Sequence, residues 1–281
     1  AMVQHHLNKN TADAWKTIEP YTLDYKTYII ENYMRATIAG YAGKTDLMIE
    51  VLSAKPPHTH SSPFYYMDYL LGLAKLRRLD NDADLYFKIF TVRYKGSNYL
   101  KSAYRYLSWS CQLKGDNKTA LVYYDLCKKS GAANIEEDKQ AESEAKEYKT
   151  WLIDLLKARL LYDGHYLDMS MDVLKKTDIK KLSCNKFKLE YHYRKARVYQ
   201  EQKLNAEAIL EYLNVIDLGK KETYYYAAYS ALQLGYIYSE KGNKDLAKLY
   251  FNMAKDDFKE NKEYVNSIEQ KAKAALKKLG K

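Results

Sequence analysis

The stretch LQLGYIYSEKGNKDLAKLYFNMA, residues 232–254, contains the spacing that decides the fold. Small Gly235 precedes a Gly242-Asn243 turn, and small Ala247 follows twelve residues after Gly235. Small side chains at these two positions let two helices approach closely, while the large residues around them fill the remaining space. Glycine in the turn permits the left-handed backbone that ends a helix. The stretch therefore predicts two antiparallel helices joined by a short turn.

The same offsets recur upstream at Ala196, Ala158 and Ser108, a unit at Gly72 fits with a turn one residue shorter, and a sixth, weaker unit is at Ala36. The small residue of each first helix serves as an anchor, and successive anchors are 36, 36, 50, 38 and 39 residues apart. Proline, which costs about 3 kcal/mol inside a helix, is absent after Pro63. The pattern predicts an all-α fold, a right-handed α-solenoid of about six helical hairpins. The six anchors are Ala36, Gly72, Ser108, Ala158, Ala196 and Gly235.

The remaining segments fit around these hairpins. Residues 264–279 place Tyr264, Ile268 and Ala272 on one stripe with lysines elsewhere, which predicts a C-terminal capping helix. Residues 133–151, inside the longest interval, have acidic residues near their start and predict a largely helical connection. We therefore expect an N-terminal extension over residues 1–21 and a single solenoid domain over residues 22–281.

Composition excludes several classes of protein. The chain has 281 residues and a formal net charge of +10, and it contains no run of roughly 18 apolar residues that would span a membrane. Its three cysteines, Cys111, Cys127 and Cys184, specify no disulfide framework. Cys111 and Cys127 take inward positions on the two helices of one hairpin. They are read as two buried thiols, with a disulfide as the alternative in an exported protein.

The sequence contains no recognised catalytic motif. A Gly-rich phosphate loop, a nucleophile elbow and an HExxH helix are all missing. His58 and His60 fall in a Pro-rich connection and are expected to be solvated, His165 falls in a turn, and His192 is expected to be a hydrogen-bonded packing residue. We therefore expect a protein that is not an enzyme, with no cofactor, no metal and no small-molecule substrate.

The repeat spacing resembles the tetratricopeptide repeat superfamily from about residue 22 to the C-terminus. The phrases at residues 94–116, 136–166 and 225–243 resemble the Tyr- and Lys-rich multi-repeat proteins of Bacteroidetes bacteria, and the chain has 30 tyrosines. The resemblance implies an α-solenoid without known catalytic residues, commonly preceded by an export signal and an upstream helical region. On this basis we expect a cell-envelope location and a C-terminal fragment of a longer protein.

The resemblance also implies where a partner binds. In tetratricopeptide arrays the concave wall is built by first-helix positions three before, one after and four after the anchor. Guanidinium groups bind carboxylates bidentately, and tyrosine and tryptophan supply rigid contact area. Such a groove suits an acidic peptide or a C-terminal carboxylate, and the alternative is that these side chains bridge adjacent hairpins. The candidates are Tyr33, Tyr69, Arg105, Trp109, Arg159, Tyr162, Tyr193, Arg197 and Tyr236.

The sequence thus favours a non-enzymatic scaffold that binds a protein or peptide in a concave groove. A carbohydrate or cell-wall binding module, with exposed tyrosines as stacking platforms, is the alternative. Nucleic-acid binding is less favoured. Between Lys75 and Arg105 eight basic residues face only three aspartates and alternate with aromatic residues, but those aromatic residues follow the core period of a helix.

Overall fold

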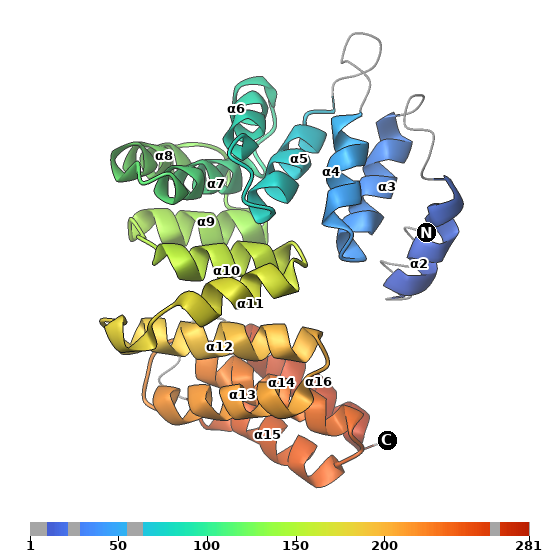
Figure 1. Ribbon diagram of the computed structural model, residues 1–281, viewed down its shortest axis with the longest axis vertical. Coiled ribbons are helices and arrows are strands. Elements are labelled where there is room, and N and C mark those ends of the chain that lie inside the picture. The colour runs from blue at the N-terminus through green and yellow to red at the C-terminus, as the bar shows by residue number, and fades with distance from the viewer. Residues whose placement is uncertain (1–9, 22–28, 55–63, 259–264, 281) are drawn as a thin grey trace. The chain divides into compact units, whose positions relative to one another are not determined.

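The computed structural model describes residues 10–21, 29–54, 64–258 and 265–280, and these residues are helical apart from their turns (Figure 1). They form fifteen α-helices and two short 3-10 helices, and no strand occurs among them. The prediction of an all-α fold is confirmed.

The chain divides into two compact units, Ala1–Tyr166 and Leu167–Lys281, here called the N-terminal and C-terminal units. The sequence analysis expects one domain from residue 22 onwards, whereas the boundary between the units falls inside the hairpin predicted at Ala158. The two units are therefore described separately.

In the N-terminal unit, three pairs of consecutive helices pack together: α3 with α4, α5 with α6, and α7 with α8. The segment expected to be an extension contributes α2, whose Ala14 and Ile18 are buried against Ile38. The elements are α2 (Thr11–Ile18), η1 (Glu19–Tyr21), α3 (Ile29–Tyr41), α4 (Thr45–Ser53), α5 (Tyr66–Arg77), α6 (Ala83–Arg93), α7 (Leu100–Leu113), α8 (Asn117–Lys129), α9 (Glu136–Lys146) and α10 (Ile153–Asp163).

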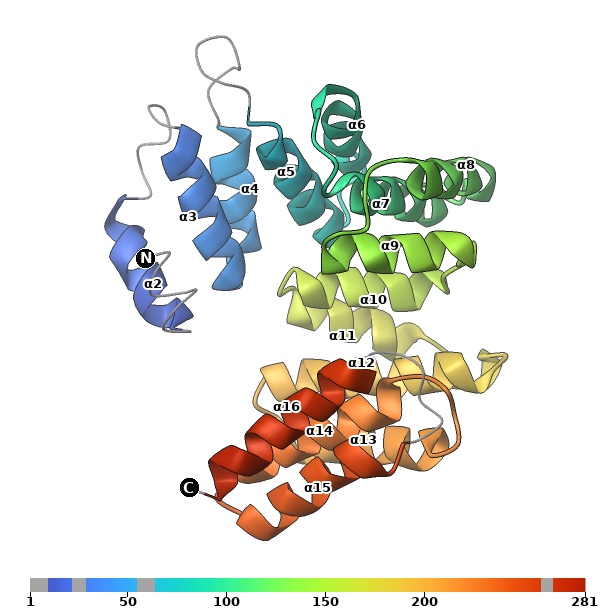
Figure 2. The same cartoon turned by 180° about the vertical axis from the view of Figure 1, so that it is seen from behind.

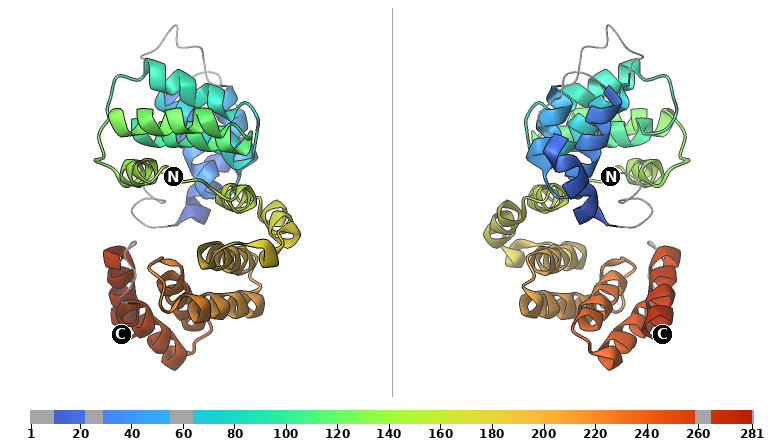
Figure 3. Two further views of the ribbon diagram at one scale, coloured as in Figure 1. Left: turned by 90° about the vertical axis from the view of Figure 1, so that its left-hand side faces the viewer. Right: turned by 90° about the vertical axis from the view of Figure 1, so that its right-hand side faces the viewer.

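In the C-terminal unit, α12 packs with α13 and α14 with α15 (Figure 3), and α16 lies against α14 and α15 (Figure 2). Ile268 and Ala272 of α16 are buried, as expected of a capping helix, while Tyr264 lies outside the described residues. The elements are α11 (Leu167–Lys176), η2 (Ile179–Lys181), α12 (Asn185–Glu201), α13 (Asn205–Gly219), α14 (Tyr226–Glu240), α15 (Lys244–Asp256) and α16 (Val265–Leu279).

A left-handed residue occurs seven positions after every one of the six anchors. Glycine takes this position in three of the turns, because it adopts a positive φ without strain. In the other three, a residue with a side chain adopts the same conformation at a cost of roughly 1–2 kcal/mol. The left-handed turn conformation therefore occurs even where a residue other than glycine makes it energetically unfavourable. The six residues and their φ angles are Gly43 (73°), Leu79 (66°), Gly115 (80°), His165 (63°), Lys203 (64°) and Gly242 (75°).

Two of the anchors are glycines at which paired helices approach closely. A Cβ atom on Gly235 would come within 2.4 Å of Cδ1 of Phe251, and one on Gly72 within 3.1 Å of Cζ of Phe87. Both phenylalanines are fully buried. The predicted role of these two glycines, close approach of two helices, is confirmed.

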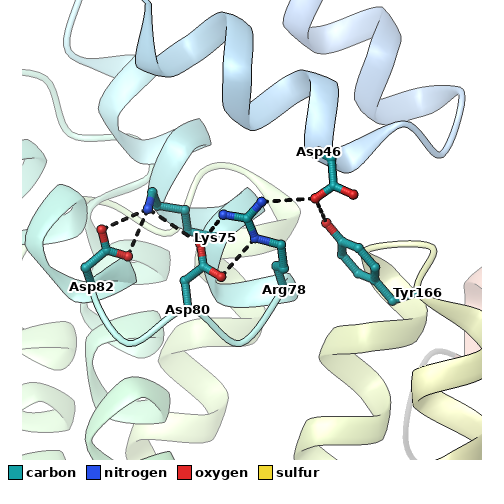
Figure 4. A network of polar contacts seen from close by, with 6 residues as sticks. All are labelled: Asp46, Lys75, Arg78, Asp80, Asp82 and Tyr166. Carbon is teal, nitrogen blue, oxygen red and sulfur yellow. Dashed lines mark hydrogen bonds and ion pairs between the residues drawn. The ribbon is translucent and has the colours of Figure 1, made fainter.

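Polar contacts join three turns of the N-terminal unit (Figure 4). Asp46, in the first turn of α4, accepts hydrogen bonds from the hydroxyl of Tyr166 at 2.7 Å and from Nη1 of Arg78 at 3.0 Å. Beside them, the hydroxyl of Thr45 donates to the carbonyl of Gly164 at 2.7 Å, across 119 residues of sequence. An open array of repeats has contacts between neighbours only, so these bonds are an addition to the repeat pattern.

Substituting Arg78 is expected to weaken this junction in a pH-dependent way. Arg78 donates to Asp80 at 2.6 Å and holds the pKa of that carboxyl below its usual value, against the opposite effect of partial burial. Because the folded-state pKa is lowered, this contribution is present above the ordinary pKa of aspartate and is lost as the pH falls through the folded value. We expect Arg78→Gln to destabilise the unit by about 1 kcal/mol at pH 7, since the pair is only partly buried.

Tryptophan fluorescence during urea unfolding measures this effect, because all three tryptophans belong to residues 1–166. Arg93→Gln, at an exposed arginine of the same unit, is the control and is expected to change little. A penalty for Arg78→Gln that was equally large at pH 7 and pH 3 would contradict the assignment to Asp80.

Candidate functional site

The inner face of α7 carries two of the nine predicted partner-binding residues. Lys101, Arg105, Trp109 and Gln112 lie three or four residues apart, so they form one stripe along the helix. None of the four is more than 4% exposed. The stripe therefore faces other parts of the chain and is covered by them.

The acidic helix α9 covers this stripe. Oε1 of Glu142 lies 3.2 Å from Nζ of Lys101, and Oε1 of Glu144 lies 3.6 Å from Nη1 of Arg105. The indole nitrogen of Trp109 donates to Oε2 of Glu144 at 3.2 Å. The carboxylate of Glu144 is thus held by the residue types that the sequence analysis assigns to an acidic peptide, and that of Glu142 by a lysine of the same stripe.

A third carboxylate of α9 caps the beginning of α7. Asp138, which is fully buried, accepts hydrogen bonds from the backbone N–H of Tyr99 at 2.6 Å and of Ser102 at 2.8 Å. The N-terminus of a helix has free N–H groups and a partial positive charge, so a carboxylate there stabilises the helix. In this case the carboxylate comes from a helix more than thirty residues away in the sequence.

The segment after α9 is also fixed to α7. The backbone N–H of Trp151 donates to Oε1 of Gln112 at 3.0 Å, and the hydroxyl of Tyr124 donates to the carbonyl of Lys149 at 2.9 Å. Gln112 occupies the predicted groove position four after its anchor. Its amide therefore binds backbone, in the way that it could bind an extended peptide.

Cationic groups and indole rings alternate where α7, α10 and residues 149–151 meet. The guanidinium of Arg105 lies 5.0 Å from the ring centroid of Trp109, and that of Arg159 lies 4.9 Å from Trp109 and 5.2 Å from Trp151. The ammonium of Lys149 lies 3.9 Å from Trp151. Nε of Arg105 and Nε1 of Trp151 are buried without a hydrogen-bond acceptor. Ring faces therefore supply much of the stabilisation of these cations.

The structure brings Arg105, Trp109 and Arg159 together, but it does not leave them all open to a partner. Arg105 and Trp109 are buried beneath α9 and α10, and Arg159 keeps about a quarter of its side chain exposed beside Asp163. The prediction of an open groove is therefore wrong at Arg105 and Trp109, because other helices cover both side chains. The physical reason is that helices from the 50-residue interval occupy this face.

The predicted tyrosines also divide into buried and half-buried groups. Tyr69 is buried among aromatic rings and donates to Oγ of Ser102, and Tyr193 is buried between α12 and α14. Tyr33, Tyr162 and Tyr236 are half-buried. For Tyr69 and Tyr193, contact with a partner is replaced by packing between helices, which is the alternative that the sequence analysis left open.

The C-terminal unit has a similar combination of cationic and aromatic side chains, and several of them are exposed at least in part. Nη1 of Arg197 donates to the hydroxyl of Tyr193 at 3.0 Å, and its guanidinium lies 6.0 Å from the ring of Tyr229. Lys271 of α16 lies 5.4 Å from the same ring. Arg197 and Tyr229 are half-buried and Lys271 is exposed. The half-exposed residues Arg197, Gln200, Tyr229, Gln233 and Tyr236, with exposed Lys271, are here called the Arg197 face.

The sequence analysis missed several residues of these faces, among them Lys101, Glu144, Trp151 and Tyr229. A signal for Lys101 was present, because it lies four residues before Arg105 on the same helix. The acidic residues of α9 were read as a helix start, and nothing local indicated which helix they would contact. Long-range packing assigns them to α7.

The histidines and cysteines form no further site among the described residues. Nδ1 of His192 lies 2.5 Å from Oε2 of Glu211, which confirms a hydrogen-bonded histidine, and His58 and His60 lie outside the described residues. Cys111 and Cys127 are free thiols, and burial raises the pKa of Cys127 to about 12. Within the described part of the chain, no group of three histidine, cysteine or acidic side chains is placed to hold a metal.

Comparisons with known proteins leave the family open. No protein-family model matches the chain, and no curated protein matches it significantly. In the described residues, no helix is long and apolar enough to cross a membrane.

Proposed function

We propose that this chain is a non-enzymatic protein-interaction scaffold of the tetratricopeptide kind, which holds an acidic segment of a partner against the inner faces of its first helices. The recurrence of a left-handed residue seven positions after each of six anchors supports a six-hairpin solenoid. Close packing at Gly72 and Gly235 supports the same architecture.

The contact between α7 and α9 carries the proposal. Lys101, Arg105 and Trp109 hold the carboxylates of Glu142 and Glu144. Charge-assisted hydrogen bonds of this kind are roughly twice as strong as neutral ones, and indole rings add cation–π attraction and contact area. The inner face of a first helix in this chain is therefore chemically suited to an acidic helix.

The Arg197 face presents the same chemistry to solvent. Arg197 stands one position after its anchor, where Trp109 stands in α7, and Gln200 corresponds to Gln112. Nε2 of Gln200 donates to Gln233 at 3.1 Å, so the amides form a continuous polar row between α12 and α14. An acidic segment can contact this row without displacing any helix.

Nucleic-acid binding is disfavoured because the basic run from Lys75 to Arg105 is largely neutralised. Five of its eight basic residues pair with carboxylates, which reduces the net attraction for phosphates. The five are Lys75, Arg78, Lys88, Lys101 and Arg105. Carbohydrate stacking is disfavoured because rings such as Tyr69 and Tyr193 pack against other rings instead of facing solvent.

A labelled peptide with the sequence of residues 134–150 tests the proposal by fluorescence anisotropy with the full chain. We expect saturable binding that is lost when Asp138, Glu142 and Glu144 of the peptide are replaced by their amides. Arg197→Gln should weaken binding about tenfold or more, since a hydrogen bond to a charged group contributes about 1.5–3 kcal/mol.

The matched control is Arg93→Gln, which removes one exposed positive charge that belongs to neither face. Equal weakening by the two substitutions would indicate attraction by net charge alone. Equal binding of the acidic and the amide peptide would contradict the proposed function.

A further inference from the structure

We infer that α9 is a detachable self-ligand of α7, which an acidic helix of a partner protein with the same spacing of carboxylates can replace. This inference rests on the proposed function, because it assigns a regulated, initially covered state to one of the two binding faces.

The first argument is that α9 has very little apolar surface to hold it. Its buried residues are Asp138, Ala141 and Ala145 only. Alanine buries a single methyl group, and hydrophobic stabilisation grows with the apolar area that is removed from water. The neighbouring helix α10 buries four leucines. Charged contacts therefore hold α9 in place, whereas the packing of apolar side chains holds α10.

The second argument is that α9 can leave without breaking another helix. Residues 130–135 and 147–152 on either side of it are not helical, so no helix continues from α9 into its neighbours. The hydrogen bonds of Gln112 to Lys149 and Trp151 lie within the second of these segments, after the end of α9, and can persist when α9 leaves. The α7 stripe would then be open at Lys101 and Arg105, beside a partly exposed Arg159.

The third argument defines the partner. On α9 the contacting carboxylates are Asp138, Glu142 and Glu144, and the fully buried apolar residues are Ala141 and Ala145. A competing segment thus needs acidic residues at positions i, i+4 and i+6 of a helix. It also needs small residues at i+3 and i+7, because Tyr124 and Cys127 pack there.

Cys127 provides a direct probe of this displacement. Its Sγ lies 3.4 Å from the carbonyl of Ala141 and its side chain is fully buried, so α9 covers it. Cys111 is half-buried and Cys184 is exposed, and both serve as internal references in the same molecule. Departure of α9 should expose Cys127 and leave the reactivity of the references unchanged.

The test is pulsed alkylation of the full chain, with the labelling of each cysteine followed by peptide mass spectrometry. We expect Glu142→Gln/Glu144→Gln to label Cys127 at least about tenfold faster than Glu137→Gln/Glu147→Gln, which alters two exposed carboxylates at α9. Raised salt should accelerate labelling of Cys127 in the unmodified chain as well, because it screens the ion pairs. Adding the 134–150 peptide should slow labelling of Cys127 in the first variant, and the amide peptide should not.

Each other outcome overturns the inference. Equal labelling of Cys127 in the two variants, or equal acceleration at Cys111, would show that α9 opens only when the whole unit unfolds. Acceleration without protection by the peptide would show that the opened face accepts no external helix. In either case, weaker binding of the 134–150 peptide to the Arg197→Gln variant would still support the proposed function, although this inference would be wrong. Loss of that binding would remove both proposals.

Discussion

Gly235→Leu is expected to destabilise the C-terminal unit by about 2 kcal/mol, because the added side chain overpacks the contact between two helices. A Cβ at this position would lie 2.4 Å from Cδ1 and 2.5 Å from Cε1 of Phe251, so α14 and α15 must separate. Overpacking a core typically costs 1–3 kcal/mol, and the gain of up to about 1 kcal/mol in helix propensity offsets only part of it.

Circular dichroism during urea unfolding measures this loss, while tryptophan fluorescence follows the N-terminal unit separately. Gly280→Leu is the matched control, because a Cβ there meets nothing nearer than the carbonyl of Leu276 at 3.8 Å. We expect the control to be nearly neutral and the tryptophan transition to be unchanged in both variants. Similar losses in the two variants would contradict the role of Gly235 in helix approach.

Arg105→Gln is expected to destabilise the N-terminal unit by about 3 kcal/mol or more. The guanidinium is 3% exposed at its side chain and pairs with Glu144, which is 12% exposed. Removing one partner of a buried pair leaves an uncompensated charge, which typically costs 3–5 kcal/mol. The guanidinium also lies against the rings of Tyr106 and Trp109, so contact area is lost together with the charge.

A double-mutant cycle separates these contributions. We expect Arg105→Gln combined with Glu144→Gln to cost less than the sum of the two single substitutions by about 1–3 kcal/mol, because the double variant leaves neither charge unpaired. Tryptophan fluorescence during urea unfolding provides the measurement, with exposed Arg93→Gln as the control. Additive costs would show that Glu144 does not stabilise the guanidinium.

Several features of the site were predictable because they depend on short-range spacing. Arg105 and Trp109 were placed on the inner side of a first helix from their offsets to Ser108, and the structure puts both on the α7 stripe. The chemistry assigned to them, recognition of carboxylates, matches the residues that contact them. The open groove was not predictable in the same way, because it depends on whether another segment covers the stripe.

Which of the predicted tyrosines would be buried and which half-buried could not be predicted either, for the same reason. Tyr193 and Tyr236 both occupy predicted inner positions of their helices, yet the first is buried and the second half-buried. Their exposure depends on how far α12 and α14 overlap, and no offset within one hairpin encodes that overlap. Periodicity therefore identified the face of each helix and left its accessibility undetermined.

The amino-acid sequence by itself determined the helices and the pairing of α3 with α4, α5 with α6, α7 with α8, α12 with α13 and α14 with α15. Helix formation, close approach at Gly72 and Gly235, and the left-handed glycine of the Gly242 turn depend on residues that are near one another in the chain. Only the tertiary structure decided that α9 covers α7 and that Thr45 binds Gly164. These contacts join segments about 40 and 119 residues apart, and such pairings depend on the packing of the whole unit, which local spacing does not specify.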